Sequence, residues 1–84
     1  MNRKDRRAAQ KTRTPAETAG ALFAQGAAAQ NAGDLDGAVR LYKRGLALDA
    51  GNPAALNNLG AALLALGRLP EASERFRQAV LLQP

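Results

Sequence analysis

The large nonpolar residues near the carboxyl end of the sequence recur at helical spacing. Successive leucines there are three, four and three positions apart, which places them on one face of a helix that starts at Pro53. These leucines are Leu56, Leu59, Leu63 and Leu66. The spacing predicts a short amphipathic helix with a leucine face.

A second nonpolar stripe follows after a break at residues 67–70, where Gly67 and Pro70 predict a turn. The stripe consists of Ala72, Phe76, Ala79 and Val80, and charged or polar side chains occupy much of the remaining circumference. The two helices are predicted to fold against each other as a hairpin. Gly60 and Ala72 are the expected contact points, because small side chains let two backbones approach closely.

A single constant shift, the one that places Leu22 on Leu56, aligns the sequence with itself. Small residues superpose on small ones and large residues on large ones. The superposed pairs are Leu22 with Leu56, Gly26 with Gly60, Ala27 with Ala61, Ala28 with Ala62, Gly33 with Gly67, Leu35 with Leu69, Ala38 with Ala72, Tyr42 with Phe76 and Leu48 with Leu82. We therefore predict two copies of one helical hairpin.

The spacing within residues 53–84 resembles the tetratricopeptide repeat, a helical hairpin whose period equals this shift. The residues that carry the resemblance are Leu56, Leu59, Gly60, Leu63, Ala72, Phe76, Ala79 and Pro84, with leucine at both aromatic positions of the first helix. The sequence is similar to the amino-terminal repeats of bacterial tetratricopeptide proteins and of proteins like the O-linked N-acetylglucosamine transferases. The resemblance implies an α-solenoid that binds proteins.

The first copy departs from this pattern at several positions. Gln25 replaces the leucine of Leu-Gly, Ala29 replaces a large residue, Gly45 replaces an alanine and Ala50 replaces the final proline. We expect Gln25 to lie near the open end of the stack, because a buried amide without a partner is unfavourable.

These observations predict an all-α protein with two stacked antiparallel hairpins. Residues 1–14 are a basic tail, expected to be disordered or a frayed helix; residues 15–52 are a first, degenerate repeat; and residues 53–84 are a second repeat. Thr14, Pro15 and Glu17 form a capping box that predicts the first helix start, and Gly33 predicts its end. Asn52 and Pro53 predict the start of the third helix.

The net charge of +5 is concentrated at the amino terminus. Residues 1–15 hold six basic side chains and one acidic side chain, whereas the remaining residues hold six of each sign. A basic arm of this kind binds phosphates nonspecifically. Nucleic-acid binding by the tail is therefore an alternative, but the tail lacks the aromatic residues that stack on bases. The sequence favours a solvated leader that keeps the chain soluble.

The sequence offers little chemistry for catalysis. It contains neither cysteine nor histidine, which removes thiol nucleophiles and the usual zinc ligands. Asp34 and Asp36 flank a predicted helix start, where capping explains them. We expect no catalytic residues, no cofactor, no metal and no membrane span, and a cytoplasmic location.

The resemblance implies a binding groove on the concave side of the stack, lined by the first helix of each hairpin. The residues projected onto it are Phe23, Ala27, Gln30, Asn57, Asn58, Ala61 and Leu64. Asn58 precedes Leu59-Gly60, at a position where the similar transferases carry asparagines along a bound peptide. An amide suits this role because it both donates and accepts hydrogen bonds. A pair of solvated polar residues in the first turns of a helix explains Asn57 and Asn58 equally well.

We expect an extended peptide or a partner helix in this groove. Self-association, or packing of further repeats, is expected at the nonpolar face of the last helix, because three or more repeats are usually needed for stability. The alternative is that the chain is the amino-terminal repeat region of a larger glycosyltransferase or methyltransferase whose catalytic domain lies beyond residue 84.

Overall fold

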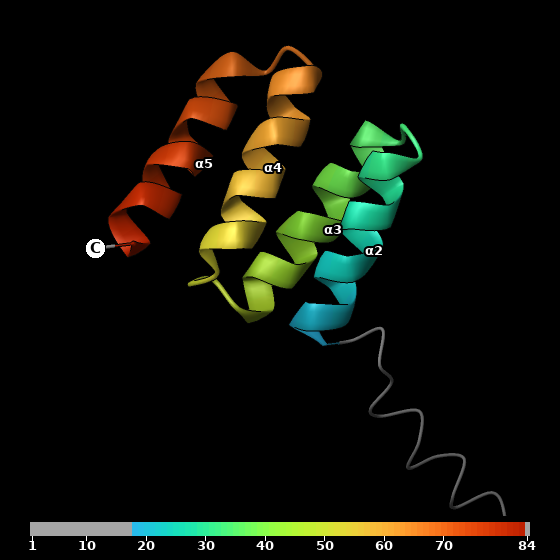
Figure 1. The fold of residues 1–84 in the computed structure, drawn as a ribbon, viewed down its shortest axis with the longest axis horizontal. Helices are drawn as coiled ribbons and strands as arrows, with labels where there is room; N and C mark the ends of the chain where they lie inside the picture. The colour runs from blue at the N-terminus through green and yellow to red at the C-terminus, as the bar shows by residue number, and fades with distance from the viewer. Residues whose placement is uncertain (1–17, 84) are drawn as a thin grey trace, which may run out of the picture.

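The computed structural model describes residues 18–83, which form four helices in chain order. These are α2 (Ala19–Asn31), α3 (Leu35–Leu48), α4 (Pro53–Ala65) and α5 (Leu69–Leu82). Helices α2 and α3 form one antiparallel hairpin, α4 and α5 form the next, and the two hairpins lie side by side (Figure 1). The prediction of an all-α fold with two stacked hairpins is confirmed. The basic tail and the predicted capping box at Thr14 to Glu17 lie outside the described residues.

Short polar side chains cap three of the four helices at their amino-terminal ends. The Thr18 hydroxyl accepts a hydrogen bond from the Ala21 N–H, and the Asp34 carboxylate accepts one from Gly37. Asn52 caps α4 and Pro53 is its first residue, as predicted. Helix α2 begins at Ala19 and is capped by Thr18, so its predicted start at Thr14 is wrong.

The two hairpin turns are copies of each other. Each first helix ends before a glycine with positive φ, at 88° for Gly33 and 81° for Gly67. The next residue then donates its N–H back into the helix, from Asp34 to the Ala29 carbonyl at 2.8 Å and from Arg68 to the Leu63 carbonyl at 2.9 Å. This left-handed C-terminal motif favours glycine because a Cβ would be strained there. Since α5 begins at Leu69, the second turn is shorter than the predicted span of residues 67–70.

Within each hairpin, a glycine of the first helix faces an aromatic ring of the second. A Cβ built on Gly26 would lie 2.9 Å from Tyr42 Cδ1, and a Cβ built on Gly60 would lie 2.7 Å from Phe76 Cε1. Both distances are far below an ordinary carbon contact of about 3.5–4.0 Å. Glycine at these equivalent positions therefore allows each ring to lie against the helix backbone, which confirms the predicted role of Gly60.

One continuous core joins the two hairpins. Its nearly inaccessible residues come mostly from α3, α4 and α5 and are Ala38, Val39, Tyr42, Leu46, Ala55, Leu56, Leu59, Ala62, Leu63, Ala72 and Ala79. The predicted leucine face of α4 supplies three of them. Val80 does not belong to this core: it is 66% exposed, because no described element covers that side of α5.

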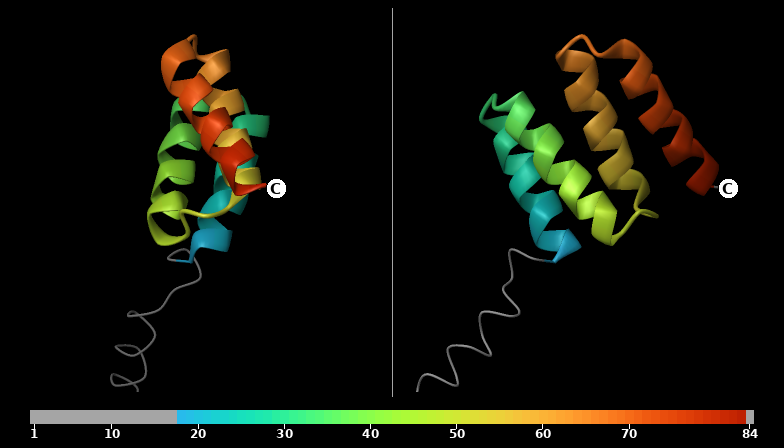
Figure 2. Two further views of the ribbon diagram at one scale, coloured as in Figure 1. Left: turned by 90° about the vertical axis from the view of Figure 1, so that its left-hand side faces the viewer. Right: turned by 180° about the vertical axis from the view of Figure 1, so that it is seen from behind.

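The stack is curved. Helix α4 packs on α3 and also touches α2, whereas the backbones of α3 and α5 make no close approach in the described part of the chain. The first helices of the hairpins are thus closer together than the second helices. The α2/α4 side is consequently the concave side, and α3 and α5 lie on the convex side. Figure 2 shows the two hairpins from the side and from behind.

Candidate functional site: the concave surface over α2 and α4

Tyr42 connects the two helices that line the concave side. Its side chain is completely buried, and its ring lies against Gly26 of α2. The hydroxyl donates a 2.9 Å hydrogen bond to Gln30 Oε1, also on α2. Burial raises the pKa of the Tyr42 phenol, and a hydrogen bond from the Asn58 side chain on α4 partly opposes this rise. Tyr42 therefore brings Gln30 and Asn58 together across the boundary between the two hairpins.

The other predicted groove residues of α4 are accessible. Asn57, Asn58 and Ala61 are exposed, and Leu64 is 52% exposed. They recur at helical spacing along α4, which gives this helix a surface with amide groups at its amino-terminal half and a leucine toward its carboxyl end. Such a surface offers hydrogen-bond donors and acceptors next to a nonpolar contact.

The predicted residues of α2 lie differently. Gln30 is half-buried and bonded to Tyr42, and Ala27 is half-buried. The Phe23 ring packs against Gly45 of α3, where a Cβ on residue 45 would lie 2.7 Å from Phe23 Cδ1. Phe23 thus takes part in the contact between α2 and α3, and its side chain remains partly exposed. Gly45, interpreted from the sequence as a degenerate position, instead makes room for this ring.

Gln25 is exposed on α2, as predicted. Its equivalent in the second copy is Leu59, which is completely buried. The difference arises because the outer side of α2 has no described helix against it, whereas α4 is covered by α3. An amide is therefore accommodated at the first position and excluded from the second.

Sequence reasoning misses the role of the Tyr42 hydroxyl, because the repeat register identifies Tyr42 only as the equivalent of Phe76. The signal is nevertheless present in that comparison: a phenol where the other copy has a phenyl ring indicates a hydroxyl with a partner. Here the partners are two of the predicted groove residues, Gln30 and Asn58.

Ion pairs lie on the convex side. Lys43 Nζ on α3 is 2.9 Å from Glu71 Oε2 on α5, and Arg68 Nη2 is 3.9 Å from Asp36 Oδ1. The Lys43 ammonium, through a hydrogen bond, holds the pKa of Glu71 below its usual value. Among the described residues, the concave side carries no charge pairs.

The described residues contain no cluster of acidic side chains, histidines or cysteines that would hold a metal ion. None of the four helices is both long enough and nonpolar enough to cross a bilayer.

The sequence profile of the tetratricopeptide repeat family matches residues 22–84, three quarters of the chain. The chain belongs to this family, whose members generally serve as noncatalytic protein-interaction modules. The comparison with curated proteins finds no match.

Proposed function

We propose that the chain is a noncatalytic interaction scaffold that holds an extended peptide or a partner helix on its concave surface. The observation that carries the proposal is the position of the buried Tyr42 hydroxyl, which donates a hydrogen bond to Gln30 on α2 and interacts with the Asn58 side chain on α4. The Asn58 side chain is exposed and lies beside the Tyr42 hydroxyl, so it is accessible to a ligand on this surface.

The surface around Asn58 suits a peptide backbone. The amide of Asn58 supplies a donor and an acceptor at a fixed place, and Asn57 supplies the same groups close by on α4. Ala61 and Leu64 add a shallow nonpolar contact for a side chain of the ligand. This combination favours recognition of the ligand's backbone amides together with one of its nonpolar side chains. We place this scaffold in the cytoplasm.

Site-specific photocrosslinking tests the proposal. A benzoylphenylalanine at Ala61, on the concave surface, is expected to capture other proteins in cells that express the chain. The same residue at Arg40, exposed on α3, is the matched control and is expected to capture few. Asn58→Ala should reduce capture at Ala61 by about tenfold, the effect of one or two hydrogen bonds to a fixed ligand. Equal capture from both positions would contradict the proposal.

A second interaction surface is proposed at the far end of the stack, over α5. The repeat register provides the comparison: Leu46 is 8% exposed under α4, whereas its equivalent Val80 is 66% exposed. Leu69 on the same helix is also exposed. We propose that this face packs against another helix, either in a second copy of the chain or in a further repeat.

Light scattering coupled to size-exclusion chromatography distinguishes these cases. Self-association predicts a mass that rises with concentration and that Val80→Glu returns to the monomer value. Arg77→Glu, on the same helix but in a polar setting, is the control. A monomer at every concentration would exclude self-association through this face.

A further inference from the structure

On the convex side, ion pairs connect the second helices of the two hairpins along only part of their length. Lys43 of α3 pairs with Glu71 of α5, and Asp36 of α3 pairs with Arg68, the residue that precedes α5. In the part of the chain that the structure describes, no ion pair or hydrogen bond joins α3 to α5 beyond Glu71. The two helices are therefore unbridged toward their carboxyl ends.

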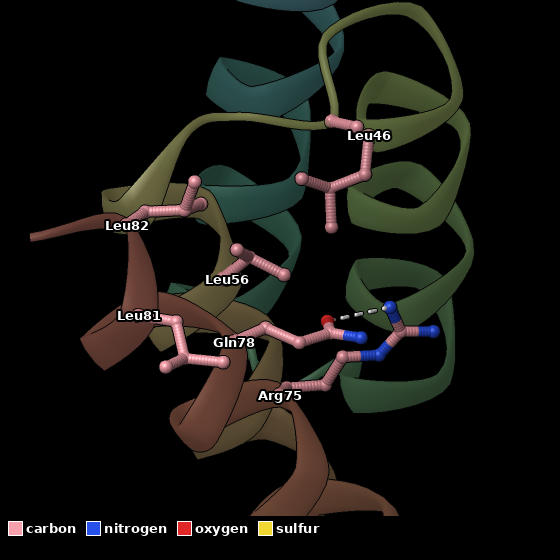
Figure 3. Close-up of a pocket in the computed structure, with 7 residues that line it drawn as sticks. Leu46, Leu56, Arg75, Gln78, Leu81 and Leu82 are labelled. Atoms are coloured by element: carbon pink, nitrogen blue, oxygen red, sulfur yellow. Dashed lines mark hydrogen bonds between the residues drawn. The ribbon is translucent and has the colours of Figure 1, made fainter.

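A cleft of about 400 Å³ occupies this unbridged part (Figure 3). The residues that line it include Leu46, Leu56, Arg75, Gln78, Leu81 and Leu82. Leu56 of α4 is buried and forms the floor, while Leu81 on the rim is 77% exposed. The cleft is thus a nonpolar depression with two polar side chains at one edge, and its volume is near the lower end of the roughly 300–1,000 Å³ usual for ligand sites.

Arg75 of α5 forms no direct ion pair with any described residue, although its charge helps to lower the pKa of Glu71, one helical turn earlier. Its guanidinium donates a 3.3 Å hydrogen bond to the neutral Gln78 Oε1. The acidic residues of α5 are paired with other cations, Glu71 with Lys43 and Glu74 with Arg77. The remaining guanidinium N–H groups of Arg75 and the Gln78 amide N–H₂ are therefore available donors at the edge of the cleft.

We infer that this cleft binds a segment of a partner protein in which a large nonpolar side chain lies next to an aspartate or glutamate. The nonpolar side chain would replace water over Leu46, Leu56 and Leu82, and the carboxylate would accept hydrogen bonds from the remaining guanidinium N–H groups of Arg75. A guanidinium recognises a carboxylate through charge-assisted hydrogen bonds that no neutral group equals. The partner segment would thereby lie between α3 and α5, with its carboxylate held by α5.

The dimensions favour a short peptide segment over a lipid. From Arg75 to Leu82 the helix rises by about 10 Å at ~1.5 Å per residue, so the cleft has room for one large side chain beside the carboxylate. A long-chain fatty acid would leave most of its tail in water. The surface is on the opposite side from the concave surface, so this inference does not depend on the function proposed for Asn58.

The experiment is a titration of the ¹⁵N-labelled full chain with blocked hexapeptides, followed by amide chemical shifts. The probe is Ac-Gly-Ser-Leu-Asp-Ser-Gly-NH₂, and the matched peptides replace Asp by Asn or Leu by Ala. We expect the Leu-Asp peptide to shift the amides of Leu46, Gln78 and Leu82 at millimolar concentrations, and each matched peptide to bind about tenfold more weakly.

Variants locate the interaction. Arg75→Gln is expected to weaken binding of the Leu-Asp peptide about tenfold and to make the Asp and Asn peptides equivalent. Arg77→Gln, two positions farther on and paired with Glu74 at 3.0 Å, is the control and should leave binding unchanged. Leu81→Ser alters only an exposed rim residue and should weaken binding several-fold with no change in the thermal midpoint.

The following results would overturn the inference. An absence of shifts at any peptide concentration would do so, as would equal binding of the Asp and Asn peptides. Shifts produced by decanoate but not by the peptides would indicate a lipid site instead. Shifts confined to Asn57, Asn58 and Ala61 would leave the concave surface as the peptide site and exclude the cleft.

Discussion

Replacing Gly26 by alanine tests the contact that holds each hairpin together. The new Cβ would lie 2.9 Å from both Cδ1 and Cε1 of Tyr42, and the ring would have to move by at least half an ångström to restore an ordinary contact. Tyr42 is completely buried, and its hydroxyl is bonded to Gln30, so it cannot turn away without loss of that bond. Overpacking of this kind destabilises by about 1–3 kcal/mol.

The same substitution also removes a glycine from a helix, which stabilises by up to about 1 kcal/mol. Gly20 provides the matched control, because it is in the same helix and a Cβ there would meet no atom within 4 Å. Gly20→Ala should therefore be neutral or stabilising, while Gly26→Ala should be less stable than Gly20→Ala by about 1–3 kcal/mol. Taking the difference between the two variants removes most of the propensity effect and isolates the overpacking.

Urea and thermal unfolding, followed by far-ultraviolet circular dichroism, measure this difference. For a domain of this size, 1 kcal/mol corresponds to roughly 4–8 °C in the thermal midpoint. Gly60→Ala should repeat the loss, since its Cβ would meet Phe76 at 2.7 Å. If Gly26→Ala were as stable as Gly20→Ala, the aromatic ring would not lie where the account places it, and the packing argument would be refuted.

Three further predictions concern other contacts. Ala72→Phe should overpack the second hairpin and cost about 1–3 kcal/mol of unfolding free energy, whereas Ser73→Phe, on the exposed neighbouring residue, should leave the urea midpoint nearly unchanged. Tyr42 is the chain's one tyrosine, so near-ultraviolet difference absorbance can follow its ionisation, and the pKa of the phenol should lie above its ordinary value in the folded protein. Because the folded pKa is raised, the free energy of unfolding should fall as pH rises past the unfolded pKa. Glu71 has a lowered pKa in the folded state, so its pair with Lys43 should stabilise the fold at neutral pH and be lost as pH falls through that pKa. The effect should be at most about 1 kcal/mol, because the pair is exposed, and it should disappear in Lys43→Met.

The repeat register predicted the helices because it depends on local patterns. Each hairpin carries its own leucine face, its own glycine facing an aromatic and its own turn glycine, so the constant shift between the copies identified the elements and their order. Asn52 and Asp34 could be recognised as caps for the same reason. All these features are determined within one turn of helix or between neighbouring elements.

The errors have a common physical cause. The nonpolar periodicity of α5 includes Val80, but periodicity does not say whether another element covers that position. Gly45 resembles a defect in the sequence because its partner, Phe23, lies on the preceding helix, and only the packing of α2 on α3 brings them together. The helix start was misplaced because Thr14 and Thr18 are both suitable caps.

The candidate site was predictable only in part. The amides of Asn57 and Asn58 could be projected onto the concave side from helical spacing alone. The contribution of Tyr42 could not, because it depends on α3 passing behind both α2 and α4. The cleft beside Arg75 depends on how far α3 and α5 diverge, which no single helix encodes.

The most direct test of the account is a nuclear Overhauser measurement on the Tyr42 ring in the free chain. If the two hairpins stack as described, the ring protons give cross-peaks to the Gly26 Hα on α2 and to the Asn58 side-chain amide on α4. Cross-peaks confined to residues of α3 would show that the hairpins are not stacked, and the concave surface would not exist.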